Sequence, residues 1–493
     1  MGRPINSVTR LRVTQLLLLS ISTLYTTTWA QNKNTTATQE LLSGFTATPD
    51  SSISSFQPLL TDSTGSFSLG FLRVNRTQLA LSVIHVPSSD PLWVANVTPS
   101  ARWSRSTRFT FNGSLVISDP SMGVFWSTNT DGDRVSLLNT SNLQIQKLSD
   151  PPTVVWQSFY FPTNALVENQ NFTSTMSLVS SNGIYSMRLG DDFIGLYAEF
   201  NRDTDQIYWK HKALQAKADI VQGQGPIYAR VNSNGYLGMY QTGNTPVDVQ
   251  AFNSFQRPTA GFLLVRLEPD GNLKGYYWDG SKWVLDYQAI QNECELPSPC
   301  GSYGLCRPGD GCACIDNRTE YNSGGCSPAV SGDFCGGGEA QNAFSVLRRK
   351  GVELPYKELM GFETMSSEEQ CEKSCEMNCS CWGAVYNNAS GFCYSVDYPI
   401  QTLVGVGDET KVGYFKVRKG AGNKEEVGFG VGVGLVGGAV VVSVGLVGFG
   451  GYMFWKRKRG IRRFSEEEEG GVCPGPYKDL GSASFRSIEL SNR

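Results

Sequence analysis

The sequence predicts a mainly β protein with disulfide-rich modules and one transmembrane helix. Three observations lead to this prediction. Residues 41–290 are rich in aromatic and β-branched side chains and in turn signals, whereas helical periodicity is scarce. Twelve of the thirteen cysteines fall between Cys294 and Cys393. Residues 428–455 form a stretch of 28 residues without a charged side chain. The length of 493 residues indicates several domains rather than one.

The N-terminal residues 1–30 have the pattern of a secretory signal peptide. Arg3, Arg10 and Arg12 form a basic start, an apolar run follows them, and Ala30 supplies a small residue for cleavage. A buried core helix would not explain a basic flank that lacks acidic residues. We therefore expect the mature protein to begin at residue 31, outside the cell.

The uncharged stretch 428–455 predicts a membrane span. As a helix it would measure ~42 Å, against a hydrocarbon core of ~30 Å, so it can cross with some tilt. Six Lys and Arg residues follow within residues 456–463 and place the C-terminal side in the cytosol. The sequence thus predicts a single-pass type I protein of the plasma membrane, with residues 31–427 outside and a short tail, 456–493, inside.

Glycine recurs within the predicted span. The string G-x-G-x-x-G at residues 432–437 matches a phosphate-binding loop by chance, because no strand precedes it. Gly430, Gly434 and Gly438 share one helix face, which would allow close approach of a second copy or of a receptor kinase partner. An ordinary span without a specific partner explains these glycines equally well.

Glycosylation signals and charge agree with this topology. Nine N-x-S/T sequons precede the span, at Asn34, Asn75, Asn96, Asn112, Asn139, Asn171, Asn317, Asn378 and Asn388. The net charge of −3 includes +3 from the signal peptide and +3 from the tail, which leaves −9 outside the cell. An acidic exterior argues against nucleic acid as a partner. Twelve cysteines on the oxidising side suit disulfides, whereas Cys473 lies in the predicted tail.

The strand-rich region contains a repeated unit of a turn, a leucine and a tryptophan. Three copies run from Leu115 to Trp126, from Leu143 to Trp156 and from Leu273 to Trp283. Such units predict short sheets that bring their indoles into a shared core. Asp279-Gly280, between two aromatic runs, predicts a hairpin with a two-residue turn.

Four segments of the first half of the exterior carry a more specific signal: LLTDSTGSFSLGF, PLWVANVTP, SLVISDPSMGVFWSTNT and VVWQSFYFPTNAL. They resemble the bulb-type (G-type) lectin domain of plant S-locus glycoproteins and S-domain receptor kinases. The later segment VRLEPDGNLKGYYWDGSKWVLDYQAIQNECELPSPCGSYGLC resembles the second half of that ectodomain and its EGF-like module. The resemblance covers roughly residues 45–418. It implies two tandem β-prism-like domains, each built on a three-fold repeat.

The resemblance and the composition together give the predicted domain boundaries. They are a signal peptide at 1–30, a bulb-type lectin domain at 31–165, a second lectin-like (S-locus glycoprotein) domain at 166–292, an EGF-like module at 293–327, a PAN/apple module at 328–418, the transmembrane helix at 428–455 and the cytosolic tail at 456–493.

The resemblance also implies where a sugar site would lie. The bulb-type lectin motif Q-x-D-x-N-x-V-x-Y hydrogen-bonds mannose hydroxyls through its amides and its carboxylate. Three copies align with it: Thr110, Asn112, Ser114, Val116 and Ser118; Leu138, Thr140, Asn142, Gln144 and Gln146; and Glu268, Asp270, Asn272, Lys274 and Tyr276. Only the third copy keeps three motif residues, Asp270, Asn272 and Tyr276. A strand-joining turn is the simpler interpretation of Asp270-Gly271-Asn272, and any surviving sugar site is expected at those three residues.

A first cysteine cluster contains Cys294, Cys300, Cys306, Cys312, Cys314 and Cys326. Spacing alone leaves fifteen pairings open. Zinc is disfavoured, because the cluster has no nearby histidine and lies on the oxidising side. The resemblance to EGF-like modules implies the pairs Cys294–Cys306, Cys300–Cys312 and Cys314–Cys326.

A second cluster contains Cys335, Cys371, Cys375, Cys379, Cys381 and Cys393. Ser366 with Glu369 predicts a capping box before a helix that places Cys371 and Cys375 on one face. The stretch NCSCWGAVY and the cysteine spacing resemble the PAN/apple module. That resemblance implies Cys371–Cys393 and Cys375–Cys381, and with them Cys335–Cys379. PAN modules commonly bind proteins or glycans; a membrane-proximal spacer or a dimer surface is an equal alternative.

Catalytic and cofactor motifs are absent. The chain has two histidines, His85 and His211, and no HExxH, G-x-S-x-G or P-loop signature, so we expect no enzyme and no metal or cofactor. The 38-residue tail is too short for a kinase. We expect a receptor-like protein that recognises an extracellular carbohydrate or protein and acts as a co-receptor or decoy. The alternatives are a cell-wall glycan-binding adhesion lectin without a signalling role, and an unrecognised carbohydrate-active enzyme with a carboxylate pair.

Overall fold

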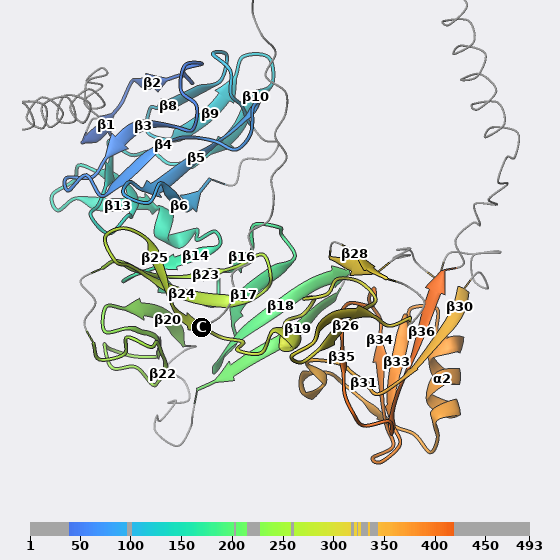
Figure 1. Cartoon of the computed structure of the whole chain (residues 1–493). Coiled ribbons are helices and arrows are strands. Elements are labelled where there is room, and N and C mark those ends of the chain that lie inside the picture. Colours follow the sequence, from blue (N-terminus) through green and yellow to red (C-terminus); the bar gives the residue numbers. More distant parts are fainter. Residues whose placement is uncertain are drawn as a thin grey trace, which may run out of the picture. The chain divides into compact units, whose positions relative to one another are not determined.

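The computed structural model describes residues 39–418, apart from 96–100, 202–203, 214–226, 258–260, 317–319, 323, 327–333 and 336–343 (Figure 1). The predicted signal peptide, membrane span and tail, with Gly430, Gly434 and Gly438, lie outside the described residues, as do the sequons at Asn34, Asn96 and Asn317. Among the helices of the described part, none is both long enough and apolar enough to cross a bilayer.

Three antiparallel sheets form the first part of the described chain (Figure 1). The first sheet has the order β3(Phe56–Thr61)-β4(Phe67–Arg73)-β5(Gln78–His85)-β6(Asp90–Val94), with β7(Ala101–Arg102) beside β5. The second has the order β10(Gly123–Ser127)-β9(Leu115–Asp119)-β8(Arg108–Phe111)-β2(Phe45–Ala47). The third has the order β1(Glu40–Leu42)-β11(Arg134–Leu137)-β12(Leu143–Lys147)-β13(Thr153–Gln157). The 3-10 turn η1(Ser158–Tyr160) follows β13.

One hydrophobic core joins these three sheets. Each sheet contributes side chains that have no exposed surface. Examples are Leu81 of β5, Phe109 of β8, Ile117 of β9 and Ile145 of β12. The strands alternate buried with half-buried residues, as β9 does from Leu115 to Asp119, because successive side chains of a strand point to opposite faces. The apolar residues that alternate with polar ones in the sequence are therefore the residues that form the core.

A second set of three four-stranded antiparallel sheets follows. The first has the order β16(Leu178–Val179)-β17(Tyr185–Leu189)-β18(Phe193–Asn201)-β19(Thr204–Lys212). The second has the order β15(Asn171–Phe172)-β20(Tyr228–Asn232)-β21(Tyr236–Tyr240)-β22(Asp248–Ala251). The third has the order β14(Ala165–Val167)-β23(Leu263–Leu267)-β24(Leu273–Trp278)-β25(Trp283–Gln288). Two successive groups of three sheets are what the lectin resemblance implies.

The turn between β24 and β25 differs from the sequence-based prediction. Trp278 pairs with Trp283, so four residues rather than two connect the strands. The Asp279 carboxylate accepts hydrogen bonds from the main-chain N–H groups of Ser281 and Lys282, both at 2.8 Å. Gly280 has φ of +99°, which glycine adopts without strain. The side chain of Asp279 thus stabilises a longer turn than the Asp-Gly pair predicts.

The cysteine-rich part contains two further sheets and a two-stranded ribbon. One sheet has the order β27(Gly311–Cys314)-β26(Gly304–Arg307)-β35(Leu403–Gly405)-β31(Val352–Glu353), and the other the order β30(Phe344–Lys350)-β36(Lys411–Arg418)-β33(Gly383–Asn387)-β34(Phe392–Val396)-β32(Glu363–Thr364). The ribbon pairs β28(Tyr321–Asn322) with β29(Gly325–Cys326). The described residues of this part also form the 3-10 turns η2(Glu293–Glu295) and η4(Lys357–Leu359). Because β26 pairs with β35 in parallel, the EGF-like segment and the PAN-like segment share one sheet.

The helix α2(Glu368–Met377) packs beside β33 (Figure 1). Cys371 and Cys375 are both buried on its inner face, as the i, i+4 spacing predicts. The predicted capping box is wrong by one residue. Ser367, not Ser366, is the N-cap, and its hydroxyl accepts from the N–H of Gln370 at 3.3 Å. Ser366 instead donates its hydroxyl to the side chain of Gln370.

Candidate functional site

The third copy of the sugar motif lies on β24 and the turn before it. Asn272 is 3 % exposed; its amide donates to the main-chain oxygen of Ile290 at 2.8 Å and accepts from the N–H of Ile290 at 3.1 Å. The Asp270 carboxylate accepts from the N–H of Asn272 at 2.8 Å, and Gly271 between them has φ of +85°. Asn272 therefore anchors the turn to the chain after β25, in agreement with the simpler interpretation of this stretch.

The two other residues of this copy have partners as well. Asp270 forms an ion pair of 2.7 Å with Lys274, which stands where the motif has valine. The Tyr276 hydroxyl donates to the carboxylate of Glu268 at 2.8 Å, and burial with this bond raises the pKa of Tyr276. A sugar at Asp270 or Tyr276 would share these groups with their partners in the protein. The three residues as a sugar site thus stay a prediction.

The second copy forms a chain of amides across β11, β12 and β13. Asn142 and Gln144 both donate to Gln157, at 2.7 and 3.2 Å. Gln146 donates to Gln144 at 2.8 Å and accepts from Arg134 at 2.9 Å. These half-buried groups satisfy one another, which rigidifies this face of the sheet.

The first copy lies along β8 and β9 and has little in common with the motif. Asn112 is exposed, and its side chain accepts a hydrogen bond from Ser43. Ser114 donates to the main-chain oxygen of Thr130 and accepts from its N–H. The hydroxyl of Ser114 therefore fixes a loop. Val116 is half-buried on β9.

Three tryptophans of the first sheet group meet edge to face. Trp93 lies 6.2 Å from Trp126 and 5.9 Å from Trp156, and the last two are 6.4 Å apart, measured between ring centroids. All three repeat tryptophans thus belong to one core or pack against it, as predicted. Trp283, the third, has its nearest ring contacts with Trp278 at 5.4 Å and His85 at 5.3 Å. The tryptophan at position 93 belongs to no repeat unit, and the sequence pattern missed its role.

A cleft of about 820 Å³ opens beside the three tryptophans. The residues lining it come from β5, β6, β10, β13, η1 and β16 and from the connections beside them. Among them are Trp93, Trp126, Trp156, Tyr160 and Phe161. Its volume falls within the range typical of small-molecule sites, about 300–1,000 Å³. The first and the second group of sheets both contribute to its walls, which is why no single repeat unit indicated it.

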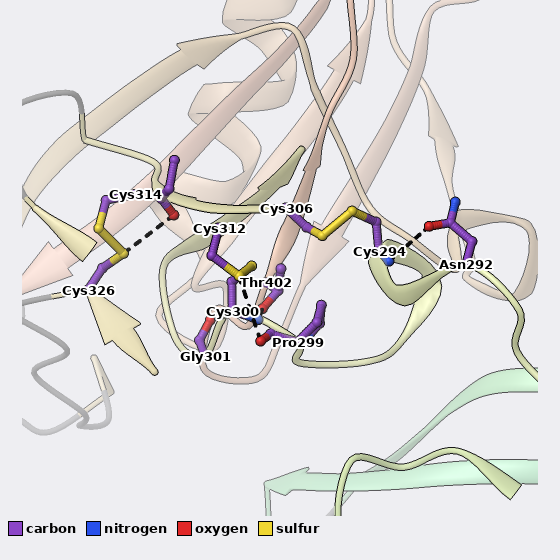
Figure 2. Close-up of a disulfide and its surroundings, with 11 residues drawn as sticks. Asn292, Cys294, Pro299, Cys300, Gly301, Cys306, Cys312, Cys314, Cys326 and Thr402 are labelled. Atoms are coloured by element: carbon purple, nitrogen blue, oxygen red, sulfur yellow. Dashed lines mark hydrogen bonds between the residues drawn. A yellow bond between two sulfur atoms is a disulfide. The ribbon is translucent and has the colours of Figure 1, made fainter. Parts of the chain in front are cut away.

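Disulfides stabilise the EGF-like segment (Figure 2). The structure pairs Cys294 with Cys306, Cys300 with Cys312, and Cys314 with Cys326, the pairs that the EGF-like resemblance implies. The main-chain N–H of Cys300 also donates to the hydroxyl of Thr402 at 2.9 Å, which ties this segment to the PAN-like part. A segment with so little apolar core depends on such cross-links.

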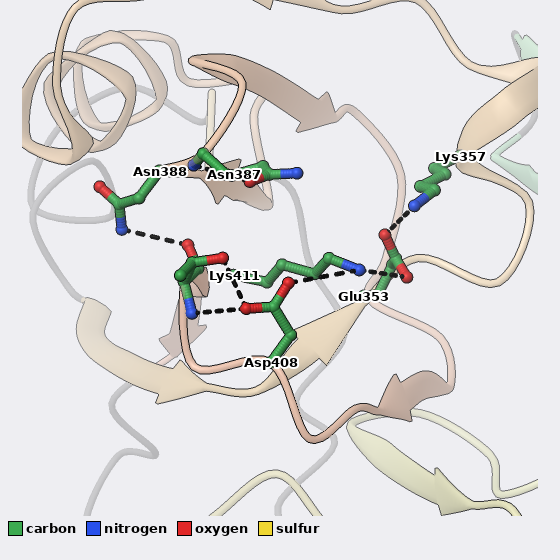
Figure 3. A network of polar contacts seen from close by, with 8 residues as sticks. Glu353, Lys357, Asn387, Asn388, Asp408 and Lys411 are labelled. Atoms are coloured by element: carbon green, nitrogen blue, oxygen red, sulfur yellow. Dashed lines mark hydrogen bonds and ion pairs between the residues drawn. The ribbon is translucent and has the colours of Figure 1, made fainter.

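The PAN-like part has three disulfides and a polar network. The disulfides are Cys335–Cys379, Cys371–Cys393 and Cys375–Cys381. Glu353 on β31 accepts from both Lys357 and Lys411, the second at 3.0 Å (Figure 3). This contact raises the pKa of Lys357. The network links β31, η4 and β36.

The six sequons within the described residues have exposed asparagines. They are Asn75, Asn112, Asn139, Asn171, Asn378 and Asn388. Asn388 lies in the loop after β33, and its side-chain amide donates to the main-chain oxygen of Thr410 at 3.1 Å (Figure 3). Exposure of the side chain is what a glycan-carrying asparagine requires.

The two histidines lie in different environments. His85 is 4 % exposed, its Nδ1 is 2.9 Å from the hydroxyl of Ser88, and its ring stacks on Phe262. Burial lowers the pKa of His85. His211 lies 2.9 Å from the carboxylate of Asp248. Among the described residues, His85 contacts a hydroxyl and His211 contacts a carboxylate, and neither ring joins both kinds of partner through hydrogen bonds as a triad requires. In this part of the chain, no group of three His, Cys, Asp or Glu is placed to hold a metal ion.

Three family models match the chain. They are D-mannose binding lectin over residues 91–188, the S-locus glycoprotein domain over residues 238–318, and the PAN domain over residues 345–415. Together with the β-rich, disulfide-linked fold, these matches define a lectin-type S-domain protein with a PAN module. The matched spans do not test the boundaries predicted from the sequence.

Related plant proteins identify the family within this class of lectin-type S-domain proteins. A PAN domain-containing protein of Arabidopsis thaliana is 55 % identical over the full length of both chains. A G-type lectin S-receptor-like serine/threonine-protein kinase of Arabidopsis thaliana is 25 % identical over 82 % of this chain, and EP1-like glycoprotein 3 of the same plant is 26 % identical over 66 % of it. This chain spans 49 % of the kinase and 78 % of the glycoprotein. The chain belongs to the family of PAN domain-containing proteins that also carry lectin-type and S-locus glycoprotein domains.

One solved structure with partial likeness is a fetuin-binding two-domain lectin of Scilla campanulata. It is 18 % identical, with 51 % of this chain and 93 % of that one covered, at a TM-score of 0.19. A TM-score of 0.19 supports no conclusion about the fold or the function of this chain.

Proposed function

We propose that the chain is a cell-surface, receptor-like protein whose exterior recognises a carbohydrate or a glycoprotein. The observation that carries the proposal is the presence of a lectin-type domain, an S-locus glycoprotein domain and a PAN domain in one chain. Two relatives, a G-type lectin S-receptor-like kinase and an EP1-like glycoprotein, support the same class of activity.

We further propose that the protein is a single-pass type I protein of the plasma membrane. The proposal uses the predicted signal peptide at 1–30 and the predicted span at 428–455. It is supported by six exposed sequon asparagines and by six disulfides in the part of the chain that would face outward. The predicted domain boundaries remain part of this proposal.

We also propose that the protein acts without a kinase of its own, as a co-receptor or a decoy. The domains that support this proposal are the lectin domain, the S-locus glycoprotein domain and the PAN domain that match the chain. A partner receptor kinase would then supply the signalling step, and either that kinase or a second copy of this chain would contact the span at Gly430, Gly434 and Gly438.

Intact plant cells that express the full-length chain with a C-terminal tag test this proposal. The cells are incubated with labelled cell-wall oligosaccharides and labelled glycoproteins, and separately with a peptide N-glycosidase that cannot cross the membrane. We expect binding above that of untransformed cells and a mobility shift of the tagged chain. A chain that neither binds any probe nor shifts would contradict the proposal.

A further inference from the structure

The cleft beside the three tryptophans presents aromatic side chains to solvent. Tyr160 is 57 % exposed and Phe161 is 54 % exposed, and both line the cleft. Phe161 stacks on Trp156 with centroids 5.8 Å apart, and its main-chain oxygen accepts from the indole N–H of Trp93 at 2.8 Å. The ring of Phe161 is therefore held in place although water reaches it. Large exposed aromatic side chains at a cleft indicate a contact surface.

Hydroxyl groups lie between the aromatic rings. Ser127, Thr163, Thr175 and Ser177 line the same cleft. The hydroxyl of Ser127 accepts one bond, from the main-chain N–H of Asn129 at 3.1 Å, and its own O–H group has no acceptor among the described residues. Because a hydroxyl has one donor and two acceptor positions, the walls keep hydrogen-bonding capacity for a ligand.

The described residues that line the cleft include no charged side chain. A phosphate, an acidic sugar or a charged peptide would lose hydration there without gaining an ionic partner. A wholly apolar segment would leave the wall hydroxyls without partners. A neutral sugar satisfies both kinds of wall, since its ring presents an apolar C–H face and its hydroxyls both donate and accept.

We propose that this cleft binds an uncharged oligosaccharide, with a sugar ring against Tyr160 and Trp126 and sugar hydroxyls toward the serine and threonine side chains. The site is separate from the three aligned motif copies, none of whose residues lines it. The inference rests on the proposed function, because it names the ligand class that the exterior recognises.

Two variants of lining residues test the site. Val179 on β16 is 43 % exposed and lines the cleft, so Val179→Arg places a charged side chain in it without opening the core. Tyr160→Ala removes an exposed ring. Val124 on β10 is 65 % exposed and lies outside the lining, which makes Val124→Arg the matched control, and Tyr160→Phe is the control that keeps the ring.

The full-length chain, purified in detergent, is titrated with neutral hexose and pentose oligosaccharides and with acidic oligogalacturonides. We expect neutral oligosaccharides to bind, to change the tryptophan fluorescence of the wild type, and to bind roughly tenfold or more weakly to Val179→Arg and Tyr160→Ala. The two controls should stay within about twofold. Thermal unfolding midpoints are compared in parallel to verify that all four variants fold.

Several results would overturn the inference. Unchanged neutral-sugar affinity in folded Val179→Arg and Tyr160→Ala would place the sugar elsewhere and leave the proposed function standing. If only acidic sugars bind, the cleft takes a charged ligand rather than a neutral one. If a protein ligand binds and both variants weaken its binding, the cleft is a protein-binding site. If no neutral oligosaccharide binds or changes the wild-type fluorescence, this inference fails, whereas the proposed function fails only if glycoproteins are not bound either.

Discussion

The ammonium group of Lys416 on β36 donates a 2.8 Å hydrogen bond to the main-chain oxygen of Cys375 in α2. A second bond, of 2.9 Å, reaches the main-chain oxygen of Asn378 just past the helix. The side chain is 1 % exposed and lies over the rings of Phe334 and Phe344. Carbonyl groups at a helix C-terminus lack intrahelical donors and attract cations. Lys416 therefore holds α2 against the sheet.

Lys416→Met should destabilise the PAN-like part, because it leaves these carbonyl groups without their donor. We expect the free energy of unfolding to fall by about 1–3 kcal/mol. Chemical denaturation of the full-length chain measures the change. Lys350→Met on the neighbouring strand β30, where the lysine is exposed, is the control and should change it by less than about 0.5 kcal/mol. Equal midpoints for the two variants would show that Lys416 is dispensable.

Asn272→Ala should cost stability whether or not a sugar binds nearby. The substitution removes two hydrogen bonds to the main chain of Ile290 in a buried position. We expect a loss of about 2–4 kcal/mol in the free energy of unfolding. Lys274→Met breaks only the part-exposed ion pair with Asp270 and should cost less than about 1 kcal/mol. Loss of glycan binding in a fully stable Asn272→Ala variant would instead indicate a direct role in sugar recognition.

His85 should make the stability depend on pH. Burial lowers its pKa below 6.5, partly opposed by Asp90, so the unfolded chain binds the proton more tightly than the folded one. This contribution to stability is complete above pH 6.5 and is lost as the pH falls, by up to about 1.4 kcal/mol per pH unit, until the folded pKa is reached. Thermal unfolding at pH 7.5 and at pH 5 measures this loss of stability.

His85→Phe is the variant for that experiment, because it keeps a ring against Phe262 and Trp278 but cannot take up a proton. We expect a smaller loss of stability between pH 7.5 and pH 5 in His85→Phe than in the wild type. An identical loss in both proteins would mean that other groups carry the pH dependence.

The exposed sequons should carry glycans. Asn75→Gln and Asn388→Gln should each remove one N-linked glycan from the full-length chain made in plant cells, seen as one step in electrophoretic mobility or in mass. Both side chains are exposed. Asn182→Gln, an exposed asparagine outside any sequon, should leave the pattern unchanged. A chain of unmodified mass at all described sequons would argue against passage through the secretory pathway.

The sequence predicted the character of the fold better than its local details. Alternating strands and the helix face shared by Cys371 and Cys375 follow from side-chain periodicity, which is a local property. The N-cap at Ser367 and the four-residue turn at Asp279 depend on which of several competent side chains finds its backbone partner. Such choices differ by little free energy, so adjacent serines or turn lengths are hard to separate from the sequence.

The candidate site was harder to predict than the fold. The motif search led to Asp270, Asn272 and Tyr276, whose side chains all have partners within the protein. The cleft combines β6, β10 and η1 with β16, and its walls at Tyr160 and Val179 come from two different groups of sheets. Lys416 was missed for a similar reason, since nothing in its neighbouring residues marks a buried cation whose partners lie about 40 positions away.

Binding of the purified full-length chain to a mixed array of neutral glycans, acidic glycans and glycoproteins tests the central claim most directly. The account predicts saturable binding to at least one carbohydrate or glycoprotein, strongest among uncharged oligosaccharides and reduced by Val179→Arg but not by Val124→Arg. A correctly folded chain that binds none of these ligands would contradict extracellular carbohydrate or glycoprotein recognition as its function.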